Sequence, residues 1–90
     1  MYIMKFEYDP DKSASNKAKH GIDFEQAQAL WRDTDVLVAQ AKTDDEPRFL
    51  VIGKIGVQYW SAVCVIRAEH VRIISVRRAR KKERDIYESE

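Results

Sequence analysis

The chain has 90 residues, 44% of which are hydrophobic, and its formal net charge is +1. This length is typical of one domain, so we expect residues 1–90 to fold as a single unit. The apolar content argues against disorder, and no apolar run approaches the roughly 18 residues of a membrane span. Residues 1–6 lack the basic segment of a signal peptide. The only cysteine, Cys64, excludes an internal disulfide, which fits a cytoplasmic protein.

The charged residues are unevenly distributed along the chain. Residues 1–66 hold eight basic and ten acidic side chains, whereas residues 67–84 hold eight basic and only two acidic ones. The basic residues of the second segment are Arg67, Arg72, Arg77, Arg78, Arg80, Lys81, Lys82 and Arg84. Such a segment attracts polyanions, but a solvated helix face has the same composition. Charge alone therefore leaves contact with nucleic acid open.

The first twenty residues predict a strand followed by a helix. Residues 2–8 alternate as in a strand, with Tyr2, Met4, Phe6 and Tyr8 on one face and Lys5 and Glu7 on the other. Asp9 is placed to cap a helix that begins at Pro10, where the missing N–H costs nothing. A polar helix then runs to His20, and Gly21 is placed to end it in the left-handed conformation.

A second helix is predicted to begin at Asp23. Gln26 stands three residues later, as in a capping box. An apolar stripe at helical spacing would then face the core. It consists of Phe24, Ala27, Leu30 and Trp31.

The remaining sequence predicts an antiparallel sheet and a last helix. The expected strands cover residues 36–39, 48–53, 57–66 and 71–76, with a loop at 43–47 and hairpins that close near 54–56 and 68–70. The last three of these strands are apolar on both faces over much of their length, so we expect both faces of the sheet to be covered. The last helix starts near Ala79 and is anchored by Ile86 and Tyr87. The predicted order, β-α-α-β-β-β-β-α, is an α+β fold.

Few residues suit metal-dependent chemistry. The two histidines, His20 and His70, have no ligand-like spacing, and the sequence has neither a cysteine pair nor a glycine-rich phosphate loop. The residues present still suffice to cleave RNA without a metal. In that reaction the 2′-hydroxyl is the nucleophile, and the enzyme stabilises negative charge and moves protons, for which arginine and general acid–base side chains are suited. We therefore expect no metal and no cofactor.

Three stretches closely resemble the signatures of BrnT-like proteins. The first comprises Glu7, Tyr8, Asp9, Pro10, Asp11 and Lys12, followed by Asn16, Lys19, His20, Gly21, Ile22, Phe24 and Ala27. The second comprises Arg48, Phe49, Ile52 and Gly53. The third comprises Arg72, Ile73, Ile74, Ser75, Arg77, Arg78 and Ala79, with Glu83, Arg84, Tyr87 and Glu88. Tyr8 replaces the usual tryptophan of the first signature, so an indole-specific contact is not expected.

The resemblance implies a toxin of a type II toxin–antitoxin system with a RelE-like fold. It implies a metal-independent endoribonuclease that inhibits translation and growth. It also implies a ribbon-helix-helix antitoxin (BrnA-like), a complex of two toxins with an antitoxin dimer, and contact with operator DNA only through the antitoxin. The partners expected from it are this antitoxin and an RNA substrate.

The predicted hairpins separate the arginines into two groups. With a hairpin near residues 68–70, Arg77 lies opposite residues 60–62, and with a hairpin near 54–56 that level faces residues 48–50. Arg48 and Arg77 are therefore expected at one end of the sheet, where they form the phosphate-binding pair. Arg67 and Arg72 are expected at the other end, about 15–20 Å away.

The candidate residues each have a functional and a structural interpretation. The candidate catalytic residues are Tyr8, His20, Arg48, Arg77 and Arg78, and the candidate RNA-binding residues are Lys12, Lys19, Arg80, Lys81 and Arg84. The structural interpretation of His20 is that it binds carbonyl groups at the C-terminal end of its helix. Tyr8 and Tyr87 fit packing roles, and Trp31 and Trp60 are expected in the core.

Two other functions remain open at this point. A RelE-like binding module without catalysis, paired with an antitoxin or nucleic acid, fits because no general base is evident. A DNA-binding regulator that acts alone is less well supported, because the basic last helix has no helix-turn-helix neighbour.

Overall fold

The structure is a computed structural model that describes residues 5–41 and 47–89. Its elements are β1 (Lys5–Glu7), α1 (Pro10–His20), the 3-10 helix η1 (Gln26–Arg32), β2 (Leu37–Ala41), β3 (Arg48–Ile55), β4 (Gln58–Arg67), β5 (His70–Arg78) and α2 (Lys81–Glu88). The α+β class is as predicted. The predicted strand residues 2–4 and loop residues 43–46 lie outside the described residues.

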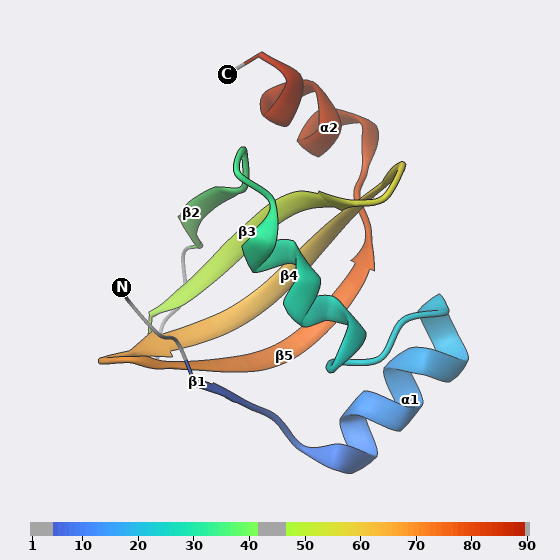
Figure 1. Ribbon diagram of the computed structural model, residues 1–90, viewed down its shortest axis with the longest axis vertical. Coiled ribbons are helices and arrows are strands. Elements are labelled where there is room, and N and C mark those ends of the chain that lie inside the picture. Colours follow the sequence, from blue (N-terminus) through green and yellow to red (C-terminus); the bar gives the residue numbers. More distant parts are fainter. Residues whose placement is uncertain (1–4, 42–46, 90) are drawn as a thin grey trace.

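One five-stranded sheet, in the order β1-β5-β4-β3-β2, forms the centre of the described structure (Figure 1). Strands β2 to β5 are an antiparallel meander, as predicted, whereas β1 pairs with β5 in parallel. The β4–β5 hairpin closes at residues 68–69, within the predicted range, and the β3–β4 hairpin closes at residues 56–57, slightly later than predicted. Gly56 adopts a left-handed conformation in the β3–β4 turn, with φ 63°.

Helix α1 has the predicted caps and lies beside the edge of β5 (Figure 1). The Asp9 carboxylate accepts a hydrogen bond from the amide of Asp11 (2.8 Å), and Gly21 has φ 81°. The buried Asn16 side chain donates to the carbonyl of Val76 (2.9 Å) and accepts from its amide (3.2 Å). Asn16 therefore satisfies a piece of strand edge that no described strand pairs with.

The second helical segment, η1, is a 3-10 helix and not the predicted α-helix. The reciprocal bonds of the predicted capping box are present: the Gln26 amide donates to Asp23 (2.7 Å), and the Asp23 amide donates to the Gln26 side chain (3.0 Å). The segment has only seven residues, and both of its ends are tied to the rest of the fold. A 3-10 helix rises about 2.0 Å per residue against about 1.5 Å for an α-helix, so a short segment spans a longer distance.

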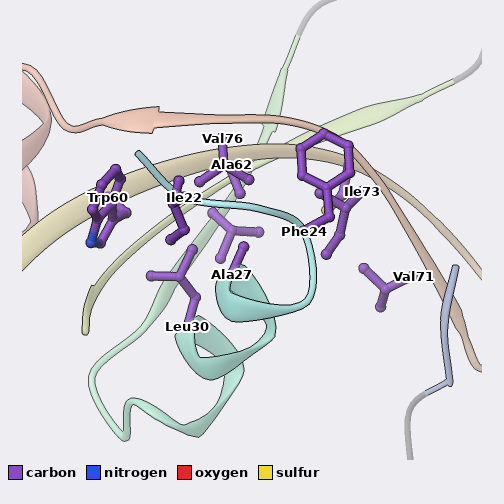
Figure 2. Packing of buried hydrophobic residues seen from close by; sticks show 11 residues of the cluster. Ile22, Phe24, Ala27, Leu30, Trp60, Ala62, Val71, Ile73 and Val76 are labelled. Carbon is purple, nitrogen blue, oxygen red and sulfur yellow. The ribbon is translucent and has the colours of Figure 1, made fainter. Parts of the chain in front are cut away.

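The core lies between η1 and one face of the sheet. Figure 2 shows Ala27 and Leu30 of η1 pointing toward Ile22, Trp60, Ala62 and Val76, with Phe24 beside Ile73. Leu30 and Phe24 have at most 1% of their surface exposed. Trp31 packs at the margin of this core, where its ring lies 5.1 Å from that of Phe6. The predicted core position of Trp60 is thus confirmed, whereas Trp31 is only partly buried.

The last helix begins later than predicted and contributes one anchor instead of two. Ala79 is still extended, and its amide donates to the carbonyl of Tyr59 (3.0 Å), so α2 starts at Lys81. Tyr87 is buried, but Ile86 is 47% exposed, so its predicted anchoring role is wrong. The Tyr87 hydroxyl donates to Asp33 (2.8 Å), which also accepts from the Lys54 amide (2.8 Å). Asp33 therefore links the end of η1 to both β3 and α2.

Candidate functional site

The face of the sheet that points away from η1 is only partly covered. We call it the open face. Strand alternation places Phe6, Val51, Ala62 and Val76 on the η1 side, so their sequence neighbours point to the open face. Helix α2 covers one end of this face, where Glu83 contacts Ser61 and Arg77. Among the described residues, no helix covers the opposite end.

The strand register sorts the residues of the open face into rows. The first row lies at the α2 end and contains Leu37, Ile52, Ser61 and Arg77. The second row contains Ala39, Leu50, Val63 and Ser75, and is apolar apart from its serine. The third row contains Ala41, Arg48, Val65, Arg72 and Glu7, and the last contains Arg67, His70 and Lys5. The two rows at the free end therefore carry most of the charged side chains of these four rows.

A hollow lies at this free end, and we call it the arginine hollow. It is lined by Glu7, Val65, Arg67, His70 and Arg72. Arg67 is paired with His70 across the β4–β5 hairpin, and Glu7 of β1 is paired with Arg72 of β5. Adjacent strands are about 4.8 Å apart, so these side chains converge from three strands. The hollow thus combines two guanidinium groups with a histidine and a carboxylate.

Arg48 belongs to the same end of the open face as the arginine hollow. Arg48 is paired with Ala41 of β2 and immediately precedes Phe49, which is paired with Cys64 of β4. Arg48 therefore lies level with Val65, the residue after Cys64, and with Arg72, the partner of Val65. Two strand spacings, about 10 Å, separate it from β5. A bound polyanion would therefore meet three arginines in two neighbouring rows.

The predicted pairing of Arg48 with Arg77 is wrong. Arg77 is paired with Ser61, as predicted, but Ser61 is paired with Ile52 and not with residues 48–50. The turn of the β3–β4 hairpin lies later than predicted, which shifts β3 along β4. Arg48 consequently lies four residues, or about 13 Å, from the level of Arg77. The predicted separation of Arg67 and Arg72 from Arg77 is confirmed by the register.

Arg77 is engaged by α2. Its guanidinium donates two hydrogen bonds of 2.8 Å to the two carboxylate oxygens of Glu83, and Glu83 also accepts from the Ser61 hydroxyl (2.9 Å) and the Arg80 amide (2.8 Å). The bond from Arg77 lowers the pKa of Glu83 to about 2, although burial opposes ionisation. This ion pair joins the end of the sheet to the first turn of α2.

None of the other predicted catalytic residues lines the arginine hollow. Arg78 points to the opposite face from Arg77, with its guanidinium 5.5 Å from the centre of the Trp60 ring. The ring of the half-buried Tyr8 packs edge-on against Phe24, at 5.7 Å, on the η1 side of the sheet. His20 is exposed at the end of α1.

All five predicted RNA-binding residues are exposed, and they lie on two helices. Lys12 and Lys19 belong to α1, whereas Lys81 and Arg84 belong to α2 and Arg80 caps it. Lys81 forms an ion pair with Asp85 (2.9 Å), and Arg84 donates to the carbonyl of Ala79 (3.4 Å).

Two further features of the described residues concern potential metal ligands and the cysteine. Within residues 5–41 and 47–89, no three histidine, cysteine, aspartate or glutamate side chains come together as a metal site would need. Cys64 is fully buried, and burial raises the pKa of its thiol to about 11. No helix of the described part is long and apolar enough to span a membrane.

Comparison with known protein families identifies the family of the chain. A family model described as the ribonuclease toxin, BrnT, of type II toxin–antitoxin systems matches residues 8–83. The chain belongs to the BrnT family. The match extends from Tyr8, directly after β1, to Glu83 in the first turn of α2, and so includes the ion pair between Arg77 and Glu83. No curated protein matches the chain.

Membership of the BrnT family gives the chain two properties. It is a ribonuclease toxin, and, as one half of a type II pair, it has an antitoxin partner. The family match includes Arg48, Arg67, His70 and Arg72, but Glu7 lies one residue before it. The three arginines and His70 therefore lie in the segment that matches the BrnT family.

Four lining residues of the arginine hollow were not among the candidate site residues predicted from the sequence: Glu7, Arg67, His70 and Arg72. The basic cluster of residues 67–84 was a signal for the two arginines, but their position relative to Arg48 depends on the exact turn of the β3–β4 hairpin. The position of Glu7 beside Arg72 results from the parallel pairing of β1 with β5, which no local sequence pattern indicates.

Proposed function

We propose that this BrnT-family chain is a metal-independent endoribonuclease whose reaction centre is the arginine hollow. The observation that carries the proposal is the clustering of Arg67 and Arg72 with His70 and Glu7 on the uncovered end of the open face. Arginine holds two phosphate oxygens in a planar fork, and histidine and carboxylate groups transfer protons. These residues supply what RNA cleavage by the 2′-hydroxyl requires.

In the proposed reaction the RNA supplies its own nucleophile. The 2′-hydroxyl loses its proton to a base while its oxygen forms a bond to the adjacent phosphorus. The bond from phosphorus to the 5′ oxygen then breaks, and that oxygen receives a proton. The products are a 2′,3′-cyclic phosphate and a 5′-hydroxyl end. Glu7 and His70 are the proposed base and acid, and Arg67 and Arg72 stabilise the extra negative charge of the transition state.

Other residues have supporting roles in this proposal. Arg48 extends the arginine hollow toward β3 and binds a neighbouring phosphate, whereas Arg77 positions α2 through Glu83. The exposed basic residues Lys12, Lys19, Arg80, Lys81 and Arg84 remain predicted contacts for longer RNA. The catalytic roles predicted for Tyr8, His20 and Arg78 stay predictions.

The assembly and fold family are also proposals. The order of strands and the helices that flank them support a RelE-like fold. The antitoxin is proposed to be a ribbon-helix-helix protein whose dimer holds two toxins and contacts operator DNA. We propose that the toxin chain is located in the cytoplasm, where RNA and the antitoxin are both available.

Cleavage of purified RNA in the presence of EDTA tests the reaction. We expect the chain to cut RNA equally well with and without the chelator, to leave 5′-hydroxyl ends, and to leave DNA of the same sequence intact. Loss of activity in EDTA, or cleavage of DNA at a similar rate, would contradict the mechanism. A protein that binds its antitoxin but cuts no RNA would instead be a binding module.

A further inference from the structure

The outer edge of β2 lacks the features that normally protect a sheet edge. Leu37–Ala41 contains no charged residue and no proline, and its register with β3 is uninterrupted from Leu37 to Ala41. Val38 is 48% exposed. Proteins usually protect such edges with charges, prolines or bulges, because unpaired N–H and C=O groups attract another strand. Among the described residues, nothing pairs with this edge.

The opposite edge of the sheet is protected in both of its parts. β1 has only three residues, two of which, Lys5 and Glu7, are charged. Beyond β1, the Asn16 side chain bonds both backbone polar groups of Val76. The contrast shows that the lack of protection is specific to β2.

We propose that the antitoxin binds this toxin by adding a β-strand to the outer edge of β2. The inference rests on membership of a type II toxin family and not on the cleavage mechanism proposed above. Strand addition satisfies the backbone groups of the edge, and side chains on alternate positions supply specificity.

A second copy of the chain is a poorer occupant of this edge. A strand of five residues is about 17 Å long. Two such strands paired side by side bury much less than the roughly 1,200 Å² of a standard stable interface. A copy of this chain joined only through β2 lacks the rest of that area, whereas an antitoxin whose chain continues beyond the added strand can contact other surfaces of the toxin.

The neighbours of the edge define the chemistry of the added strand. Val38 lies on the η1 side of the sheet and calls for an apolar side chain opposite it. Ala41 lies on the open face and is paired with the exposed Arg48. An acidic side chain opposite Ala41 would be two strand spacings, about 10 Å, from the β3 backbone at Arg48, within reach of two long side chains. The added strand therefore ends beside the row that contains Arg48 and Arg72.

Hydrogen exchange on the full-length chain, alone and in complex with the antitoxin encoded beside its gene, locates the contact. We expect the amides of residues 37–41 that do not bond to β3 to exchange rapidly in the free chain. In the complex we expect these amides to exchange at least tenfold more slowly. A stable complex in which β2 exchanges as in the free chain overturns the proposal.

Two matched variants provide a second readout. Val38→Lys places a charge on the edge, and we expect it to weaken antitoxin binding at least fivefold. Val57→Lys, at an 83% exposed valine in the β3–β4 turn, should bind as the unchanged chain does. Both variants should keep their RNA cleavage, which separates failure of this proposal from failure of the proposed function. If Val38→Lys instead leaves antitoxin binding intact and converts a dimer of the chain alone to a monomer, the occupant is a second copy.

Discussion

Two arginines of the same strand, Arg72 and Arg77, have contrasting surroundings. Arg77 is held by Glu83 through two bonds of 2.8 Å, and this contact raises the pKa of its guanidinium. Arg72 is exposed and lines the arginine hollow. An arginine already neutralised by a carboxylate is less available to a phosphate than one that faces a hollow. We therefore propose a structural role for Arg77 and a catalytic role for Arg72, although the two arginines have similar sequence contexts.

Replacement of Arg72 tests this distinction. Removal of a charge-stabilising donor typically lowers the rate by about 10²–10³-fold, so we expect Arg72→Ala to lose RNA cleavage to that extent. It should remain folded, because its exposed side chain contributes little to stability. Cleavage rates paired with circular dichroism provide the measurement.

Arg32→Ala is the matched control for Arg72→Ala. Arg32 is an exposed arginine at the end of η1, on the far side of the sheet from the arginine hollow. Its removal should leave the cleavage rate within a factor of two or so of the original, as expected for a side chain outside the site. Equal losses in both variants would show that general positive charge, and not the arginine hollow, accounts for the activity.

At the scale of elements, α2 is attached by a half-buried ion pair. The side chains of Arg77 and Glu83 are 28% and 13% exposed. The pKa of Glu83 is about 2, below its ordinary value of 4.5, chiefly because Arg77 bonds its carboxylate. A lowered carboxylate pKa stabilises the fold fully above the ordinary value, and this stabilisation is lost as the pH falls toward the folded value. The attachment of α2 should therefore weaken in acid.

Glu83→Gln should remove this acid sensitivity. At pH 7 the variant should be less stable by about 2 kcal/mol, and the difference from the original chain should shrink as the pH falls from 4.5 to 2. Urea unfolding at several pH values measures the difference in the free energy of unfolding between the two chains. Asp85→Asn is the control, because the pair of Asp85 with Lys81 is 63% and 81% exposed and contributes little. A constant difference at all pH values would contradict the assignment.

The contact between η1 and β3 depends on a glycine. A Cβ atom at Gly53 would lie 3.1 Å from Cδ2 of Leu30 and 3.3 Å from Cγ2 of Val36. We expect Gly53→Ala to destabilise the fold by about 1–3 kcal/mol, as overpacking does, and thermal unfolding measures this. Leu30→Val shortens the obstructing side chain, so the double variant should lose less stability than the two single losses combined. Strict additivity would mean that Leu30 does not cause the crowding.

Elements were more predictable than their register. The caps at Asp9 and Gly21 are local features, and the structure confirms both. The β3–β4 hairpin differs from prediction by only a residue or two, but any shift of a turn is doubled in the pairing of the two strands. Ile52 therefore faces Ser61 where residues 48–50 were expected. The η1 helix type depended on tertiary constraints at both ends of a short segment, which propensity does not describe.

At the scale of the whole molecule, a net charge of +1 conceals a directional arrangement. The uncovered end of the open face carries Lys5, Arg48, Arg67 and Arg72 together with Glu7, whereas Glu83 and Asp33 at the α2 end bind partners within the fold. The sequence indicated a basic segment, and family resemblance indicated RNA as its target. The position of the charges required the sheet, because residues from β1, β3, β4 and β5 converge there although they are far apart in the chain.

The single amide side chain of Asn16 also limits how this protein can polymerise. A sheet with two open edges can accept a copy at each and elongate into a fibril, whereas a sheet with one blocked edge stops after one addition. Asn16 occupies both polar groups of Val76, and the short, charged β1 covers residues 70–72 of β5. An uncharged β2, the edge proposed to bind the antitoxin, therefore does not carry the risk of elongation that a second such edge would add.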